Sequence, residues 1–233
     1  MEFDAKHGPL VTLRAAFLAV GLCSSAAADC DLALLLALDV SSSVDAEEYI
    51  LQRDGLAAAL EAPEVTRSIL SDGAHPVALA AYEWSGQNQI VMILDWTLLV
   101  DDVAIKAAAA QLRMTTRSYD TFPTAIGPAL GQGAVLLQSA PPCKRRVIDV
   151  SGDGIGNDGF EPRHAYRHFP FDGVTVNGLA VLGADPKVVD YYVDEVQHGL
   201  GAFVETAVGY EGYEAAMRRK LLREIGGLLI GAR

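Results

Sequence analysis

The chain has 233 residues, 51% of them hydrophobic, and a formal net charge of -12 at neutral pH. This length suits one domain with a well-buried core, and the apolar content excludes a disordered chain. The acidic charge argues against binding to nucleic acid or to an anionic membrane surface, because both need a basic face on the protein.

The first 28 residues are predicted to be a secretory signal peptide. An apolar run over 15–22 is too short to span a bilayer, and Ala26-x-Ala28 matches the small-residue pattern of a cleavage site. We therefore expect cleavage near Ala28 and Asp29, a periplasmic or secreted protein, and no membrane span in the mature chain. Residues 29–233 are predicted to form a single domain. The alternative for the first segment is an N-terminal helix of that domain.

Buried-strand patterns alternate with helical patterns along the rest of the chain. Strands are expected at 31–38, 77–83, 89–96, 146–150, 174–181 and 202–206. Helices are expected at 44–61, 101–113, 124–138, 161–169, 186–197 and 211–230. The short loop between the second and third strands carries Gly86 and Asn88 and predicts an antiparallel hairpin. The alternation predicts an α/β fold with a doubly wound, mostly parallel sheet, one antiparallel edge strand and helices on both faces.

The first strand, a continuous apolar run, ends in Asp39, Ser41 and Ser43. Such a run is typical of a strand buried on both faces of a parallel sheet, and ligands bind at the carboxyl ends of such strands. These hard oxygen atoms suit a hard cation. Alternatively, the two serines cap the helix that follows.

Two cysteines follow the predicted cleavage site, and each stands just before an apolar strand. These are Cys30 and Cys143. If the two strands are parallel neighbours, both thiols lie at the same edge of the sheet, and an oxidising compartment then favours a disulfide between them. The alternative is two unrelated small buried residues.

Two later segments also offer oxygen ligands, with Thr124 at the predicted start of a helix and Asp153 in a glycine-rich loop after a strand. Together with the segment 39–43, which reads DVSSS, they resemble the metal-ion-dependent adhesion site (MIDAS) of the von Willebrand factor type A domain, the fold of the integrin inserted domain. The segment 39–43 is similar to the D-x-S-x-S signature of that family. More narrowly, 145–154 and 83–86 are similar to an exported bacterial family with this domain and with undefined function.

The resemblance implies a divalent cation, Mg²⁺ or alternatively Mn²⁺ or Ca²⁺. Its predicted ligands are Asp39, Ser41, Ser43, Thr124 and Asp153. The serine hydroxyls would bind the cation directly and the threonine directly or through water, while the two aspartates would hold coordinated waters. Mg²⁺ usually keeps several waters when only one or two carboxylates bind it. By analogy with the family, a carboxylate of a partner would complete the coordination shell.

Two of the predicted ligands have rivals. Thr121 is the alternative to Thr124, which is preferred because a helix is expected to start there. Asp149 is the alternative to Asp153, and it is otherwise an outer hydrogen-bond acceptor or a partner for a nearby arginine. Asp153 is preferred because a glycine follows it and because an unpaired carboxylate within a strand is costly.

These features favour a non-enzymatic, exported, cation-dependent binding module that recognises a protein or another ligand with a carboxylate. A metal-dependent hydrolase or phosphoryl-transfer enzyme is the first alternative, since Asp39 at a strand end resembles an aspartyl nucleophile. Against it, no Asp-x-Asp follows the first strand and no G-x-S-x-G elbow occurs. A scaffold with a vestigial metal site is the second alternative.

Overall fold

A computed structural model describes residues 1–2, 30–71, 73 and 75–226. The predicted signal peptide lies outside the described residues, apart from its first two positions, and so do positions 227–230 of the last predicted helix. No helix in the described part of the chain is long and apolar enough to cross a membrane.

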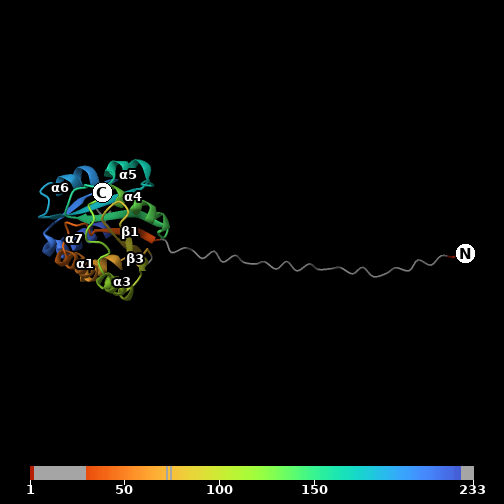
Figure 1. Ribbon diagram of the computed structural model, residues 1–233. Helices are drawn as coiled ribbons and strands as arrows, with labels where there is room; N and C mark the ends of the chain where they lie inside the picture. Colours follow the sequence, from red (N-terminus) through yellow and green to blue (C-terminus); the bar gives the residue numbers. More distant parts are fainter. Residues whose placement is uncertain (3–29, 72, 74, 227–233) are drawn as a thin grey trace.

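The centre of the molecule is a six-stranded sheet (Figure 1). Its strands are β1 (Cys30–Asp39), β2 (Val77–Trp84), β3 (Ile90–Leu99), β4 (Cys143–Gly152), β5 (Val174–Leu182) and β6 (Val204–Val208). Their order is β3-β2-β1-β4-β5-β6. β3 pairs antiparallel with β2 at one edge, and the other pairs are parallel. The predicted fold class is therefore confirmed.

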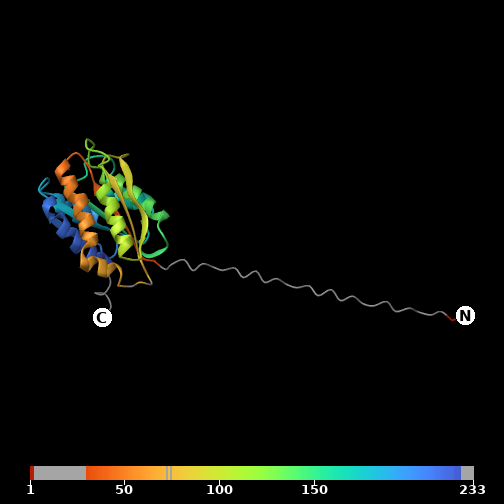
Figure 2. The ribbon, with the colours of Figure 1, turned by 90° about the horizontal axis from the view of Figure 1, so that it is seen from below.

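Helices cover both faces of the sheet. They are α1 (Ala46–Glu61), α2 (Pro63–Ile69), α3 (Asp102–Met114), α4 (Ile126–Leu136), α5 (Pro162–His168), α6 (Val188–Tyr191) and α7 (Tyr213–Ile225). One core joins the sheet to α1, α2, α3 and α7, and a second joins it to α4, α5 and α6 (Figure 1). α1 and α7 pack side by side (Figure 2). Gln52 of α1 contacts the carbonyl of Asp39 at the end of β1, and Tyr213 of α7 contacts Ser151 near the end of β4.

β1 is buried on both faces because its side chains alternate between the two cores. Leu34 and Leu36 pack in the core of α1 and α7, whereas Leu35 and Ala37 pack in the core of α4. This arrangement follows from the period of two along a strand, and it explains the continuous apolar run in the sequence. The strand ends at Asp39, between β2 and β4 in the middle of the sheet.

The predicted helix start at Thr124 is wrong by two residues, since α4 begins at Ile126. The backbone of Thr124 is instead bound by the loop that follows β4. Its N–H donates to the side chain of Asn157 at 2.9 Å, and its carbonyl accepts from the backbone N–H of Asn157 at 2.9 Å. These contacts between distant segments hold Thr124 in a non-helical position that helical periodicity does not reveal.

Other bounds also differ from the predictions. Pro63, expected to follow the end of a helix, is the first residue of the separate helix α2, where its missing N–H costs nothing. The helix predicted at 186–197 is α6 followed by a π-helical turn, Tyr192–Val196. The last helix begins two residues after its predicted start, because a 3₁₀ turn, Tyr210–Gly212, comes first.

The predicted disulfide is confirmed. Cys30 and Cys143 are partners in the register of β1 and β4, their Cα atoms are 4.3 Å apart, and the two sulfur atoms are bonded. The bond closes a sequence separation of 113 residues. It joins the amino ends of β1 and β4. At their carboxyl ends, β1 ends at Asp39 and β4 ends one residue before Asp153.

Removing this bond is expected to lower the free energy of unfolding by about 4 kcal/mol, because the unfolded chain regains the entropy of a long open loop. The variant is Cys30→Ser combined with Cys143→Ser, and the measurement is denaturant unfolding with and without reductant. Reductant should destabilise the wild type to the level of the double variant and leave the variant unchanged. Equal stability of the two oxidised proteins would contradict the prediction.

Candidate metal site

The loop between β1 and α1 holds three of the predicted ligands. The helix cap of α1 is Asp45, whose side chain accepts from the backbone N–H groups of Glu47 at 2.8 Å and Glu48 at 2.9 Å. The alternative role of Ser41 and Ser43 as helix caps is therefore wrong. Their hydroxyls are left for other contacts at the carboxyl end of the sheet.

All five predicted residues meet at this point, although they come from three distant segments. The hydroxyl oxygens of Ser41 and Ser43 are 3.1 Å apart, and the hydroxyl of Ser43 donates to Oδ1 of Asp153 at 2.8 Å. The hydroxyl of Thr124 donates to that of Ser41 at 3.2 Å. Oδ1 of Asp39 accepts the backbone N–H of Ser41 at 2.8 Å. The result is a cluster of three hydroxyls and two carboxylates.

Burial of this cluster is uneven. The side chains of Asp39, Ser41, Thr124 and Asp153 are buried, whereas Ser43 is exposed. The cluster therefore reaches solvent on the side of Ser43 and is closed towards the sheet.

The two carboxylates are incompletely satisfied by the protein. Oδ2 of Asp39 and Oδ2 of Asp153 are buried and have no hydrogen-bond partner within the described residues. Burial raises the pKa of Asp39 to about 7, against the opposing effect of its hydrogen bonds with Ser41, and burial also raises the pKa of Asp153. Buried, unpartnered carboxylate oxygens are costly unless a proton or a cation neutralises them.

The donor set fits a hard divalent cation. It consists of oxygen atoms only, with two carboxylates and three neutral hydroxyls, and such ligands suit Mg²⁺, Mn²⁺ or Ca²⁺ better than a soft transition metal. Within the described residues no group of three or more His, Cys, Asp and Glu side chains could hold a metal. The present cluster brings together two such side chains, Asp39 and Asp153, and its other donors are hydroxyls.

Arg117 connects the loop before Thr124 to the residues that follow β1. Its guanidinium donates to the backbone carbonyls of Val40 at 3.1 Å and Ser41 at 2.9 Å. The contact brings a positive charge close to the cluster, where it opposes the burial effect on the pKa of Asp39. Sequence reasoning missed Arg117, because nothing in its neighbourhood marks a contact with a strand end so far away along the chain.

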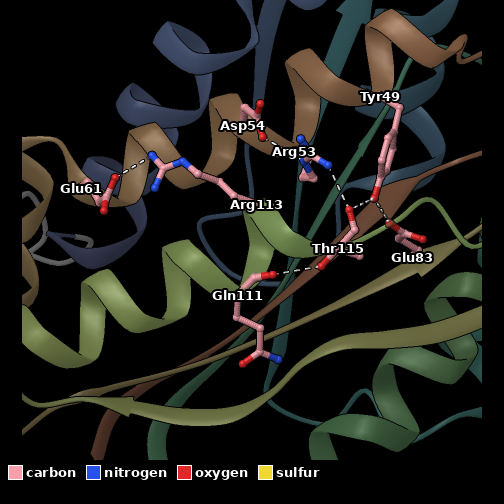
Figure 3. Close-up of polar contacts among 8 residues, drawn as sticks. All are labelled: Tyr49, Arg53, Asp54, Glu61, Glu83, Gln111, Arg113 and Thr115. Carbon is pink, nitrogen blue, oxygen red and sulfur yellow. Dashed lines mark hydrogen bonds and ion pairs between the residues drawn. The ribbon is translucent and has the colours of Figure 1, made fainter.

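A second fastening of the same loop comes from Glu83, at the end of β2. Its fully buried carboxylate accepts from the hydroxyl of Tyr49 at 2.7 Å and from the backbone N–H of Ser118 at 2.8 Å. Arg53 of α1 donates to the carbonyl of Thr115 at 3.0 Å, next to the hydroxyl of Tyr49 (Figure 3). α1, β2 and the loop are thus tied together beside the cluster. A carboxylate within an apolar strand was the available sequence signal for Glu83.

The structure separates the rival ligands from the preferred ones. Thr121 is exposed in the loop, whereas Thr124 is buried and its hydroxyl contacts Ser41. Asp149 is buried within β4, and its Oδ1 lies 2.7 Å from Nζ of Lys220. Its partner is therefore a lysine of α7 rather than an arginine, and its charge is engaged away from the cluster.

Gly152, the last residue of β4, is packed closely behind the cluster. A Cβ atom at this position would lie 2.7 Å from Oδ2 of Asp39 and 2.8 Å from the hydroxyl oxygen of Tyr192. That hydroxyl is also buried and has no hydrogen-bond partner within the described residues. Tyr192 is therefore an additional polar neighbour of Asp39, and sequence reasoning did not identify it.

The chain belongs to a family described as proteins of unknown function (DUF1194), whose model matches residues 29–229. A comparison with curated proteins found no match.

Solved structures confirm the resemblance to von Willebrand factor type A domains in fold. Proximal thread matrix protein 1 of the mussel byssus is 14% identical, with a TM-score of 0.63 over 83% of this chain and 48% of that one. The pilus adhesin SpaC of Lactobacillus rhamnosus GG is 14% identical, with a TM-score of 0.60 over 84% and 31%. A von Willebrand factor type A protein of Catenulispora acidiphila is 16% identical, with a TM-score of 0.58 over 84% and 43%.

The chain thus spans less than half of the length of each of these structures. The mussel protein has also been solved with a MIDAS motif occupied by zinc.

Gly152→Ala is expected to destabilise the protein by about 1–3 kcal/mol, because the added methyl group must displace Asp39 or Tyr192. Gly154→Ala is the matched control, since a Cβ atom there would lie 3.9 Å from the hydroxyl oxygen of Thr124, an ordinary van der Waals contact. Denaturant unfolding measures both variants. The packing argument fails if the two substitutions have equal effects.

Proposed function

We propose that this member of the family is an exported binding module that takes up a divalent cation and binds a protein, or another ligand with a carboxylate, through it. The observation that carries the proposal is the pair of buried, unpartnered oxygens, Oδ2 of Asp39 and Oδ2 of Asp153, beside three clustered hydroxyls. Asp39, Ser41, Ser43, Thr124 and Asp153 form a MIDAS-type site in this proposal, with Mg²⁺ as the expected ion and Mn²⁺ or Ca²⁺ as alternatives.

In this proposal the residues contribute to ion binding in two different ways. Ser41 and Ser43 offer neutral hydroxyls, and Asp39 and Asp153 supply the negative charge. A cation bound mostly by neutral donors keeps affinity for a further anionic ligand, such as the carboxylate of a partner. Ser43 is the exposed member, so the partner would approach from that side.

Export is supported by the disulfide between Cys30 and Cys143, because such bonds persist in oxidising compartments. Proteins with the same fold include a pilus adhesin and a byssus matrix protein. A single domain over 29–233, following a cleaved signal peptide, is part of the proposal.

A binding role is favoured over hydrolysis by the position of Asp39. Its side chain is fully buried, and one of its oxygens is bound to the backbone of Ser41, whereas an aspartyl nucleophile must meet its substrate. A panel of phosphatase and esterase substrates, assayed with added Mg²⁺, tests the alternative directly. Turnover that is lost in Asp39→Asn would replace the binding proposal with an enzymatic one.

Ser41→Ala is expected to weaken Mg²⁺ binding at least about tenfold, because it removes a central hydroxyl that contacts both Ser43 and Thr124. Ser42→Ala is the matched control within the same motif, since Ser42 is exposed and lies outside the proposed ligand set. Titration calorimetry with Mg²⁺ and with Mn²⁺ measures both variants. Absence of binding to the folded wild type would indicate a vestigial site.

A partner from the native exported fraction is expected to bind the wild type in Mg²⁺, to be released by excess chelator, and to bind Ser42→Ala but not Ser41→Ala. A pull-down with the three proteins, with and without chelator, makes the measurement. Binding that persists unchanged in chelator would refute a role of the cation in recognition, even if calorimetry detects the ion.

Cation affinity is expected to depend on pH, because burial raises the pKa of Asp39 to about 7. Below that pH the carboxyl holds a proton that the cation must displace. The apparent Mg²⁺ affinity should therefore rise about tenfold for each pH unit up to about pH 7 and stay constant above it. Without cation, the free energy of unfolding should fall as the pH rises from the ordinary pKa of 3.8 towards 7. In this range the folded protein keeps the proton on Asp39, whereas the unfolded chain loses it.

Calorimetry at several pH values and unfolding in chelator measure the two effects. An Mg²⁺ affinity that stays constant between about pH 6 and about pH 8 would mean that Asp39 is already ionised in the folded protein.

A further inference from the structure

A second group of ionisable side chains is sealed between α7 and the sheet, away from the cluster of hydroxyls. Lys220 of α7 is fully buried, and its Nζ lies 2.7 Å from Oδ1 of Asp149 in β4 and 2.7 Å from Oε1 of Glu224 in α7. Asp149 and Glu224 are 1% and 3% exposed. Water therefore has little access to any of the three charged groups.

Neighbouring groups hold Glu224 in place. Its Oε1 also accepts a hydrogen bond from the side-chain amide of Asn177 at 2.9 Å, and its backbone carbonyl accepts from Arg145 at 2.7 Å. The centroid of the Phe203 ring lies 5.2 Å from Nζ of Lys220, and the ring forms one wall of the site. Glu224 is thus a fixed acceptor that touches the amine directly.

The charges of this site do not balance. Two carboxylates and one ammonium leave a net negative charge in a buried place, where unpaired charge is very costly. Oδ2 of Asp149 and Oε2 of Glu224 have no hydrogen-bond partner within the described residues. Burial, with the repulsion of Glu224, raises the pKa of Asp149 to about 7. One additional proton on Asp149 makes the whole group neutral.

We propose that Lys220 and Asp149 become joined by an intramolecular amide bond, formed by the protein itself with Glu224 as the catalytic proton carrier. A desolvated lysine amine is a competent nucleophile, and a protonated carboxyl is a far better electrophile than a carboxylate. The fixed contacts bring amine, carboxyl and base together, which is the main requirement for such a reaction.

The reaction needs no other reagent. Glu224 takes one proton from the ammonium of Lys220, and the freed amine attacks Cγ of the protonated Asp149. As the C–N bond forms, nitrogen passes a second proton to the departing hydroxyl through Glu224, the Cγ–O bond breaks and one water molecule leaves. Glu224 ends with the first proton. An ion pair in an apolar surrounding is thereby replaced by a neutral amide.

Asp149 is favoured over Glu224 as the acceptor. Asn177 donates a hydrogen bond to Oε1 of Glu224, the same oxygen that lies beside the amine, so Glu224 is placed to carry the proton rather than to be attacked. The bond to Asp149 would also join α7 to β4, whereas a bond to Glu224 would join two positions of one helix. The disulfide already joins β4 to β1, so three elements of the fold would be covalently connected.

The test is mass spectrometry of the full chain, expressed with export, after reduction and determination of its N-terminus. The wild type should be lighter than its sequence by one water molecule. Trypsin should release a branched peptide in which 147–163 is joined to 220–223. A mass equal to the sequence overturns the proposal. Loss of ammonia, which would indicate Asn177, or a branch to the peptide that begins at Glu224, also overturns it.

Variants separate the chemistry from folding. Lys220→Arg and Glu224→Gln should both retain the full sequence mass, and Glu224→Gln preserves the shape of the site, so it is the variant expected to stay folded. Lys106→Arg is the matched control, since Lys106 is an exposed lysine that pairs with Asp102, and it should still lose water. A folded Glu224→Gln protein that forms the bond at the wild-type level would refute the role of Glu224.

Discussion

The burial of Asp39 and Asp153 is the constraint on which the rest of the structure depends. Both side chains lie at the carboxyl end of the sheet, where β1 and β4 run side by side, and each keeps one unpartnered oxygen. Such an arrangement persists only if the surrounding fold fixes it and if a proton or a cation neutralises it. The disulfide joins the two strands at their other ends, where Cys30 and Cys143 are partners in the register, and it opposes a slip of β1 along β4.

The positions of the cluster's side chains depend on residues outside the cluster. Arg117 joins the loop before Thr124 to the end of β1, and Glu83 joins the same loop to β2 and, through Tyr49, to α1. Each contact uses a charged group with several partners, and such hydrogen bonds are stronger than neutral ones. Thr124 is therefore held by the sheet, the helix and the loop after β4 together, which makes its position insensitive to the exact start of α4.

The sequence was sufficient to predict those features that a few consecutive residues define. The continuous apolar run located β1, and the hydroxyl spacing after Asp39 located one part of the cluster, since both signals are complete within a few residues. It was insufficient where the partner is remote. Lys220 stands among basic residues near the end of an amphipathic helix, where solvent exposure is the usual outcome. Its burial is explained by Glu224 together with Asp149, which is remote in sequence. Arg117 and Tyr192 were not predicted for the same reason.

β4 and the loop that follows it carry two buried carboxylates close together in sequence, and their surroundings differ. Asp153 lies beyond the end of the strand, next to exposed Ser43, where an ion from solvent can arrive and leave. Asp149 lies within the strand, and its counter-charge must come from the protein. Ser151 stands between them and bonds Gln52 at 3.3 Å and Tyr213 at 3.0 Å, so neutral groups of α1 and α7 separate the two sites. This difference in access to solvent is the reason why we propose exchangeable binding at the first site and a permanent bond at the second.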